Sequence, residues 1–408
     1  DAAAARAGLA KEASLSNGGA VFATTPRDAT KPTLLVHAST HVAAPDDAAW
    51  RDVADAGPFD AGFADGRVRA AGAKDGKGSA LTPFFAAEAL SKSRGGATMN
   101  LVVVCAAQSD DAAAAELLEA KDLAADYAIV AENGAGLGAA APGAPALVFG
   151  CRGRLDVAVV SSHAVLVASA VAALHASGDA AKTCGLPRLE PAGLKLDGGG
   201  LPAGAVVDAI AARASYRAAP SPAFSDAAAG AHASAPFCAL PCEPAVVVSA
   251  LRTIGETTRA DVSVLLPPGY DDLDAAAAGV ATALGLEREG NAEGGPGYLT
   301  DGAQPFADAV LAAQAAAYET PPARTLAPVR SAVACALARR LPAAAVFQAG
   351  RAPTYRDRRG RPGESVAVAD VVAEAKVLCR VLRADVPRTP APRPRPFDAV
   401  ASREAASD

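Results

Sequence analysis

The sequence predicts an α/β fold, a mostly parallel sheet with an inserted α+β unit. Short apolar runs alternate with helical patterns in the first part of the chain, which is typical of βαβ units. The middle part changes to the order strand, helix, strand, strand, helix, and the α/β alternation resumes after it. The length of 408 residues exceeds one typical domain, so we expect two.

Three apolar runs in the first part predict buried strands. They are TLLVHAS at 33–39, NLVVVCAA at 100–107 and DYAIVAE at 126–132. Each run is short, rich in β-branched residues and apolar on both faces, as expected for a sheet that helices cover on both sides. The segments at 78–92 and 110–124 between them predict helices.

The middle of the chain predicts the inserted α+β unit. RLDVAVV at 154–160 predicts a strand and AVLVASAVAALHAS at 164–177 a helix. PAVVVSAL at 244–251 and RADVSVLLPP at 259–268 predict two further strands, and 272–286 predicts a second helix. This order is typical of a small α+β layer.

The α/β pattern resumes near residue 305. The segments 305–319 and 366–384 predict helices, the second of them long and amphipathic, and AAAVFQAG at 343–350 predicts a strand. The end of the chain, from 387 onward, is proline-rich and basic, which predicts a disordered or extended tail.

Composition excludes several classes of protein. The net charge of −6 and the pI near 5.5 leave no basic stripe for nucleic acid. No stretch reaches the roughly 18 apolar residues that cross a bilayer, so we expect no membrane partner. Seven scattered cysteines lack zinc-ribbon spacing, which favours free thiols in a reducing compartment, and we expect the cytoplasm.

Four acidic positions have ordinary structural interpretations when each is taken alone. Asp110 and Asp111 open a predicted helix, where carboxylates interact favourably with the helix dipole. Asp75 lies in the glycine-rich turn KDGKG, and Glu132 ends a predicted strand. Their order along the chain, together with the stretch around His41, is what indicates a function.

Several motifs occur in an order that resembles a known family. PTLLVHASTHVAAP begins at residue 32, and Trp50, Pro58-Phe59 and DGRVRAAGAKDGKG at 65–78 follow it. DYAIVAEN at 126–133 and PALVFGCRG at 145–153 come next. Carnosinase-type dipeptidases typically read PTVLVYGHLDVQPA, Trp, PF, DGKLYGRGASDDKG, DYIVISDN and PAITYGTRG. The chain therefore resembles this family of the zinc carboxypeptidase and aminoacylase superfamily.

The resemblance implies a catalytic α/β domain in two segments with a lid or dimerisation domain between them, and hence a homodimer. It also implies zinc as cofactor: two ions about 3.5–4 Å apart activate a water and polarise an amide carbonyl of a small peptide or acyl amino acid. The implied boundaries are 1–154 for the first catalytic-type segment, 155–298 for the inserted domain, 299–386 for the second segment and 387–408 for the tail.

The resemblance also implies roles for particular residues. The bridging carboxylate falls on Asp75, and a further ligand falls on Glu132. The family's pair of general base and ligand falls on Asp110 and Asp111 with a one-residue shift, and otherwise on Ser109 and Asp110. The lid histidine that contacts substrate falls on His163.

Two family histidines are absent from the positions where the resemblance places them. The first falls on Ser39 and the last near Gly360, and neither replacement competes with water for zinc. His41 shares a strand face with Ser39 and is the alternative ligand, although we expect that it did not take over that role. Two hypotheses follow: a metal-dependent dipeptidase or amidohydrolase with an eroded site, or a non-catalytic relative (a pseudoenzyme) that binds partners. A decaying gene product is a third interpretation.

Overall fold

The computed structural model describes most of the two segments predicted to form the α/β domain, and several strands of the segment between them. Its described residues are 10–12, 21–25, 27–40, 42, 44–54, 57–106, 125–131, 142–162, 196–197, 245–254, 257–266, 273, 277–278, 287–300, 304–327, 330–341, 345–357 and 361–388. The predicted helices at 110–124 and 164–177, and most of the one at 272–286, lie outside these residues.

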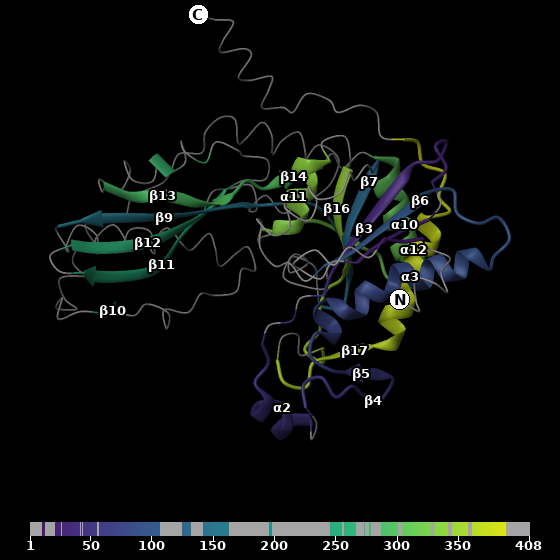
Figure 1. Ribbon diagram of the computed structural model, residues 1–408, viewed down its shortest axis with the longest axis horizontal. Coiled ribbons are helices and arrows are strands. Elements are labelled where there is room, and N and C mark those ends of the chain that lie inside the picture. Colours follow the sequence, from purple (N-terminus) through teal and green to yellow (C-terminus); the bar gives the residue numbers. More distant parts are fainter. Residues whose placement is uncertain are drawn as a thin grey trace, which may run out of the picture.

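A nine-stranded, mostly parallel sheet forms the centre of the molecule, which confirms the predicted fold class (Figure 1). Its main path runs β1-β2-β6-β3-β7-β16-β8-β14, and β15 also pairs with β8. The strands are β1 (Ala10–Glu12), β2 (Val21–Thr24), β3 (Thr33–Ser39), β6 (Asn100–Ala106), β7 (Tyr127–Ala131), β8 (Pro145–Cys151), β14 (Tyr298–Leu299), β15 (Ala323–Ala327) and β16 (Ala345–Arg351).

The parallel strands at the centre are those that the apolar runs predict. β3 pairs in parallel with both β6 and β7, and β16 pairs in parallel with β7. Every residue of β6 is buried, as is every residue of β3 except Ser39. Burial on both faces explains why these strands read as continuous apolar runs and not as alternating ones.

Helices cover both faces of this sheet. On one face lie α3 (Gly78–Ser91), α10 (Pro305–Tyr318) and α12 (Val368–Val381), whose apolar side chains share a buried cluster with Leu34 and Val36. On the other face α11 (Ala332–Arg340) packs near Leu35. The predicted helix at 366–384 starts later than expected, because β17 (Ser365–Ala367) takes its first residues into a strand. None of the helices in the described part of the chain is long and apolar enough to cross a bilayer.

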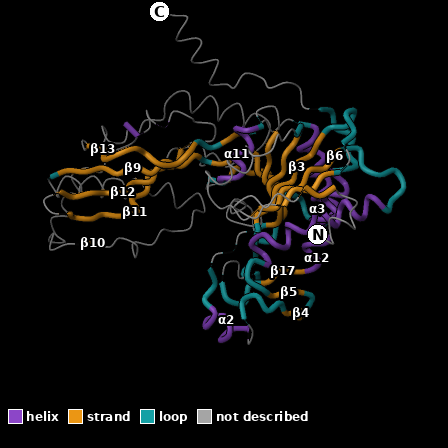
Figure 2. Tube along the Cα trace, in the orientation of Figure 1, coloured by secondary structure: helices purple, strands orange, loops and turns teal. Residues whose placement is uncertain are grey.

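A second sheet extends away from the first, at the left of Figure 1 and in orange in Figure 2. Its order is β10-β11-β12-β9-β13. The strands are β9 (Gly153–Ser161), β10 (Leu196–Asp197), β11 (Ala245–Ile254), β12 (Thr257–Leu266) and β13 (Glu287–Gly295). β8 leads directly into β9, and β13 leads back into β14 of the first sheet.

A small three-stranded sheet lies below the central one, with the helix α2 (Asp47–Ala54) near it (Figure 1). It consists of β17, β5 (Arg67–Arg69) and β4 (Gly62–Ala64). β17 and β5 are almost 300 positions apart in the chain, and the side chain of Arg67 joins them by donating to Ser365. The small sheet therefore brings the two ends of the α/β pattern together.

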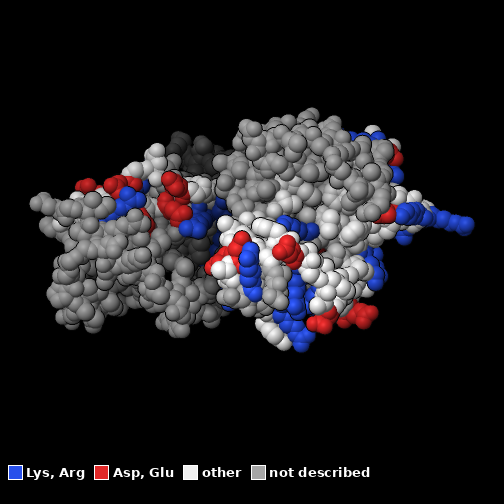
Figure 3. Space-filling model, turned by 60° about the horizontal axis from the view of Figure 1, so that its bottom comes forward, with Lys and Arg blue, Asp and Glu red and all other residues white. Residues whose placement is uncertain are grey.

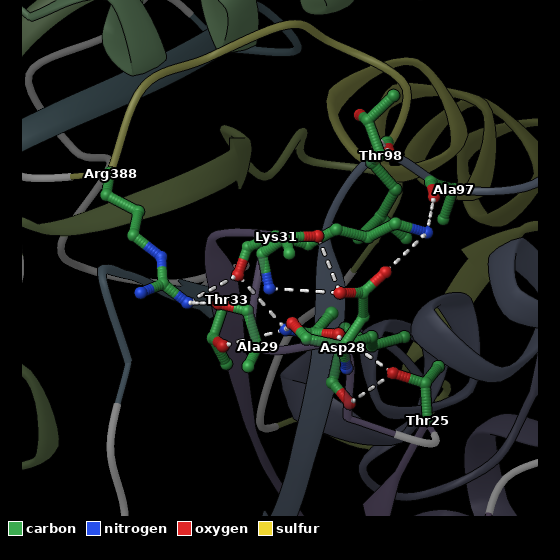
Figure 4. Close-up of polar contacts among 12 residues, drawn as sticks. Thr25, Asp28, Ala29, Lys31, Thr33, Ala97, Thr98 and Arg388 are labelled. Carbon is green, nitrogen blue, oxygen red and sulfur yellow. Dashed lines mark hydrogen bonds and ion pairs between the residues drawn. The ribbon is translucent and has the colours of Figure 1, made fainter.

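The segment after α12 is fastened to the start of β3. Arg388 donates to the carbonyls of Ala29 and Lys31, and Lys31 donates to the carbonyl of Ala97 (Figure 4). The hydroxyl of Tyr127 donates to the carbonyl of Pro387. The first residues of the proline-rich segment are thus bound to the sheet.

Candidate functional site

The turn that carries Asp75 is a short π-helix at Ala73–Lys77, between the small sheet and α3. Gly72 precedes it with φ of 76°, in the left-handed region that favours glycine. π-helical turns are rare and are frequent at functional sites. The backbone of Asp75 is described, but its side chain is not.

Gly76 lets this turn approach the carboxyl end of β3. Its φ is 138°, and a Cβ at this position would lie 2.2 Å from the carbonyl oxygen of Ser39. The second aspartate of the family pattern therefore cannot occupy position 76 in this conformation. Gly76 places the turn of Asp75 directly against Ser39, the last residue of β3.

Glu364 holds the same turn from the other side. Its carboxylate accepts hydrogen bonds from the backbone N–H groups of Gly72 (3.1 Å) and Lys74 (2.8 Å). Lys77 adds a third contact, since its ammonium donates to the carbonyl of Ala71 at 3.0 Å. A buried carboxylate that accepts two N–H bonds is a strong local restraint. These hydrogen bonds restrain the backbone of the Asp75 turn.

A buried group of charges lies beneath the turn. Lys74 is only 1% exposed, and its charge acts on Glu374 of α12 and on Asp357. Burial would raise the pKa of Asp357, but hydrogen bonds from Thr354 and Arg67, with the charge of Lys74, lower it. Burial raises the pKa of Glu374, although Lys74 and the hydroxyl of Ser79 act in the opposite direction. Buried charges of this kind are costly unless they are paired.

A partly open pocket lies beside these charges, between the sheet and the helices α10 and α12. Its volume is about 410 Å³ including space open to solvent. Its walls are mostly aliphatic, and Gln314, Tyr318 and Glu374 supply polar groups. Among the described residues, neither the hydroxyl of Tyr318 nor the Oε1 of Gln314 finds a hydrogen-bond partner.

His37 lies inside the sheet and not at the site. It is 2% exposed on β3, and burial lowers its pKa to about 4. Its Nδ1 atom has no hydrogen-bond partner in the part of the chain that the structure describes. The imidazole is therefore neutral and buried at physiological pH, on the strand that leads to Ser39.

The structure places few of the site residues that the sequence predicts. His41, Asp110, Asp111, Glu132 and His163 lie outside the described residues. Among the residues that are described, no group of three His, Cys, Asp or Glu is placed to hold a metal ion. Those residues alone therefore do not fit a zinc ion. The ligand set stays a prediction.

The buried charges beneath the turn were not predicted from the sequence, although a signal existed. Asp370 and Glu374 lie on the same stripe of α12 as the buried residues Ala373, Val377 and Leu378. Acidic residues on the apolar stripe of an amphipathic helix need a buried cationic partner. Arg351 supplies one for Asp370, and Lys74 lies near Glu374.

Charged side chains also gather on the underside of the molecule, toward the small sheet (Figure 3). Lys and Arg side chains form a cluster there, with Asp and Glu among them. Arg67 forms an ion pair with Asp357, and the more exposed Arg69 lies 3.9 Å from Asp65. The basic side chains of β5 are thus partly neutralised by neighbours.

Comparison with known proteins identifies relatives of the fold. No family model and no curated protein matches the sequence. An M20 family metallo-carboxypeptidase from Sulfolobus solfataricus has a similar structure: TM-score 0.62, 16% identity, 93% of this chain and 91% of that one. Aminoacylhistidine dipeptidase from Vibrio alginolyticus has a TM-score of 0.58 and 12% identity, and the match covers 95% of this chain and 91% of that one. Human carnosine dipeptidase 1 has a TM-score of 0.56 and 14% identity, and the match covers 93% of this chain and 88% of that one.

These similarities extend over nearly the whole of each chain. At such low identity they establish the fold and not the chemistry. The chain therefore shares the fold of these three proteins. In this chain the fold has a large, mostly parallel sheet and a second sheet between β8 and β14.

Proposed function

We propose that the chain is a metal-dependent amide hydrolase, similar to carnosinase-type dipeptidases, that acts on a small peptide or an N-acyl amino acid. The observation that carries the proposal is the restrained turn of Asp75. Glu364, Lys77 and the close contact between Gly76 and Ser39 hold this turn at the carboxyl end of β3. In parallel α/β sheets this edge is where ligands bind.

Asp75, Glu132 and Asp111 would hold the metal, with His41 as the alternative imidazole. A bound metal would supply an activated water and a polarised amide carbonyl. Asp110 would take the proton from the attacking water as general base, and His163 would contact the substrate. A mostly carboxylate ligand set suits one weakly held zinc or manganese ion better than a tight pair.

A non-catalytic role is the second candidate, and one observation favours it. Ser39 stands where the family has its first histidine, and Gly76 where the family has a second aspartate. Losing these groups removes the interactions that stabilise a hydrolytic transition state. In this case the inserted sheet would serve a homodimer or another partner.

Metal analysis and hydrolysis assays separate the two candidates. We expect purified protein to bind at least half an equivalent of zinc or manganese, and to hydrolyse members of a panel of dipeptides and N-acyl amino acids. Asp75→Asn should abolish both, since an amide is a poor ligand for either ion. Glu319→Gln, at an exposed position after α10, should leave both unchanged and is the matched control. Binding of less than a tenth of an equivalent, with no hydrolysis, would favour the non-catalytic role.

A further inference from the structure

Two buried cysteines face each other where the two large sheets meet. The Sγ atoms of Cys151, at the end of β8, and Cys335, on α11, lie 3.4 Å apart. Both side chains are almost completely buried, at 0% and 1% exposed. Neither sulfur takes part in a disulfide, and the two cysteines are separated by 184 positions in the chain.

The surroundings of Cys151 favour its thiolate form. Burial alone would raise the pKa of this thiol, but hydrogen bonds from Cys335 and from the backbone of Ser331 and Tyr298, together with the charge of Arg330, lower it. The N–H of Ser331 lies 3.5 Å from the sulfur. A thiolate is the nucleophilic form of cysteine, so these contacts favour reaction at Cys151.

Another buried cysteine of the same sheet shows that burial alone does not lower the pKa of a thiol. Cys105 on β6 is 6% exposed, and burial raises its pKa to about 12. Its sulfur contacts the carbonyl of Ala80 at 3.8 Å. Cys105 therefore serves as a matched control for Cys151.

We infer that Cys151 and Cys335 form a redox-active dithiol, which hydrogen peroxide converts to a disulfide. The thiolate of Cys151 attacks one peroxide oxygen, breaks the O–O bond and becomes a sulfenic acid. The sulfur of Cys335 then attacks that sulfur, the S–S bond forms, and the S–O bond breaks. The two thiol protons leave with the two peroxide oxygens, so two thiols and one peroxide give one disulfide and two waters.

The position of the pair gives the disulfide a structural consequence. Cys151 pairs with Tyr298 at the point where β8 passes into β9 and where the chain returns from β13. Ser331 caps α11 by accepting from the N–H of Ala334. A disulfide would tie the start of α11 to the root of the inserted sheet. The pair would therefore restrain that junction when peroxide is present.

Peptide mapping tests the inference on the full-length protein. Reduced protein is treated with a few equivalents of hydrogen peroxide, alkylated, digested and analysed by mass spectrometry. We expect a peptide in which a disulfide joins Cys151 to Cys335, and dithiothreitol should cleave that disulfide. Cys105 should remain a thiol and be alkylated. The cross-link should raise the Tm by about 5 °C, since it closes a long loop in the unfolded chain.

Two variants sharpen the test. In Cys335→Ser the second step cannot occur, so dimedone should label Cys151 as a sulfenic acid. Cys105→Ser should cross-link as the unchanged protein does. The inference fails if Cys151 and Cys335 of the unchanged protein are both still alkylated after peroxide treatment. It also fails if Cys151 forms a disulfide with Cys184, Cys238 or Cys242 instead. None of these outcomes depends on metal or on hydrolysis.

Discussion

At the scale of single residues, His37 shows how a buried titratable group makes stability depend on pH. Burial lowers the pKa of the folded state to about 4 from an ordinary value of 6.5. As the pH falls below 6.5, the unfolded chain takes up the proton first, because the folded chain keeps this imidazole neutral. The free energy of unfolding therefore decreases between pH 6.5 and pH 4.

His37→Leu should remove that decrease. The contribution of His37 to the loss amounts to about 3 kcal/mol between neutral pH and pH 4, at roughly 1.4 kcal/mol per pKa unit. Urea unfolding followed from pH 8 to pH 4 measures it for both proteins. At pH 8, where His37 is neutral in both the folded and the unfolded chain, the free energies of unfolding of the two proteins should differ only by the effect of the side-chain replacement itself. A His37→Leu profile as steep as the original would show that other groups cause the pH dependence.

At the scale of elements, the Asp75 turn depends on Glu364, whose carboxylate accepts hydrogen bonds from two of its backbone N–H groups. Glu364→Gln removes the charge and turns an amide donor toward one of the two N–H groups, of Gly72 or Lys74. We expect a loss of about 2 kcal/mol in the free energy of unfolding. Thermal or urea unfolding measures it, with Glu287→Gln on the exposed strand β13 as control. Equal stability of both variants would contradict the role of Glu364.

The elements also show how far sequence patterns reach. β3, β6 and β7 could be predicted because burial on both faces demands uninterrupted β-branched runs. β13 could not, because Glu287–Gly295 is rich in glycine and glutamate and lacks an apolar run; it pairs with β9, and Glu289 accepts from Arg259 of β12. Asp75 could be located from its motif, but Lys74 could not be assigned to a buried site, since its partner Glu374 comes 300 positions later.

At the scale of the whole molecule, the segment after α12 closes the fold. Val386 is 7% exposed and belongs to the same buried cluster as Leu34 and Phe306. Thr98 fastens the same segment by donating to the carbonyls of Leu382 and Ala384. These contacts join the segment after α12 to β3, to α10 and to the residues that precede β6. The domain boundaries and the homodimer stay predictions.

Val386→Ala should therefore lower the free energy of unfolding, although Val386 lies near the end of the chain. We expect about 2 kcal/mol, from lost burial and the cavity left behind. Its neighbour Asp385 is exposed, so Asp385→Ala should change stability by less than about 0.5 kcal/mol. Calorimetry on the two variants gives the comparison. Similar melting temperatures for both would mean that this segment does not contribute to global stability.

The order of the central strands also has a consequence for synthesis. β16 lies between β7 and β8, so these two strands, neighbours in the chain, are not neighbours in the sheet. A ribosome that adds 5–20 residues per second completes β16 roughly 10–40 s after β8. During that interval β7 and β8 each present an unpaired edge to other chains. We therefore expect the nascent chain to be prone to strand pairing with other chains until its second α/β segment emerges.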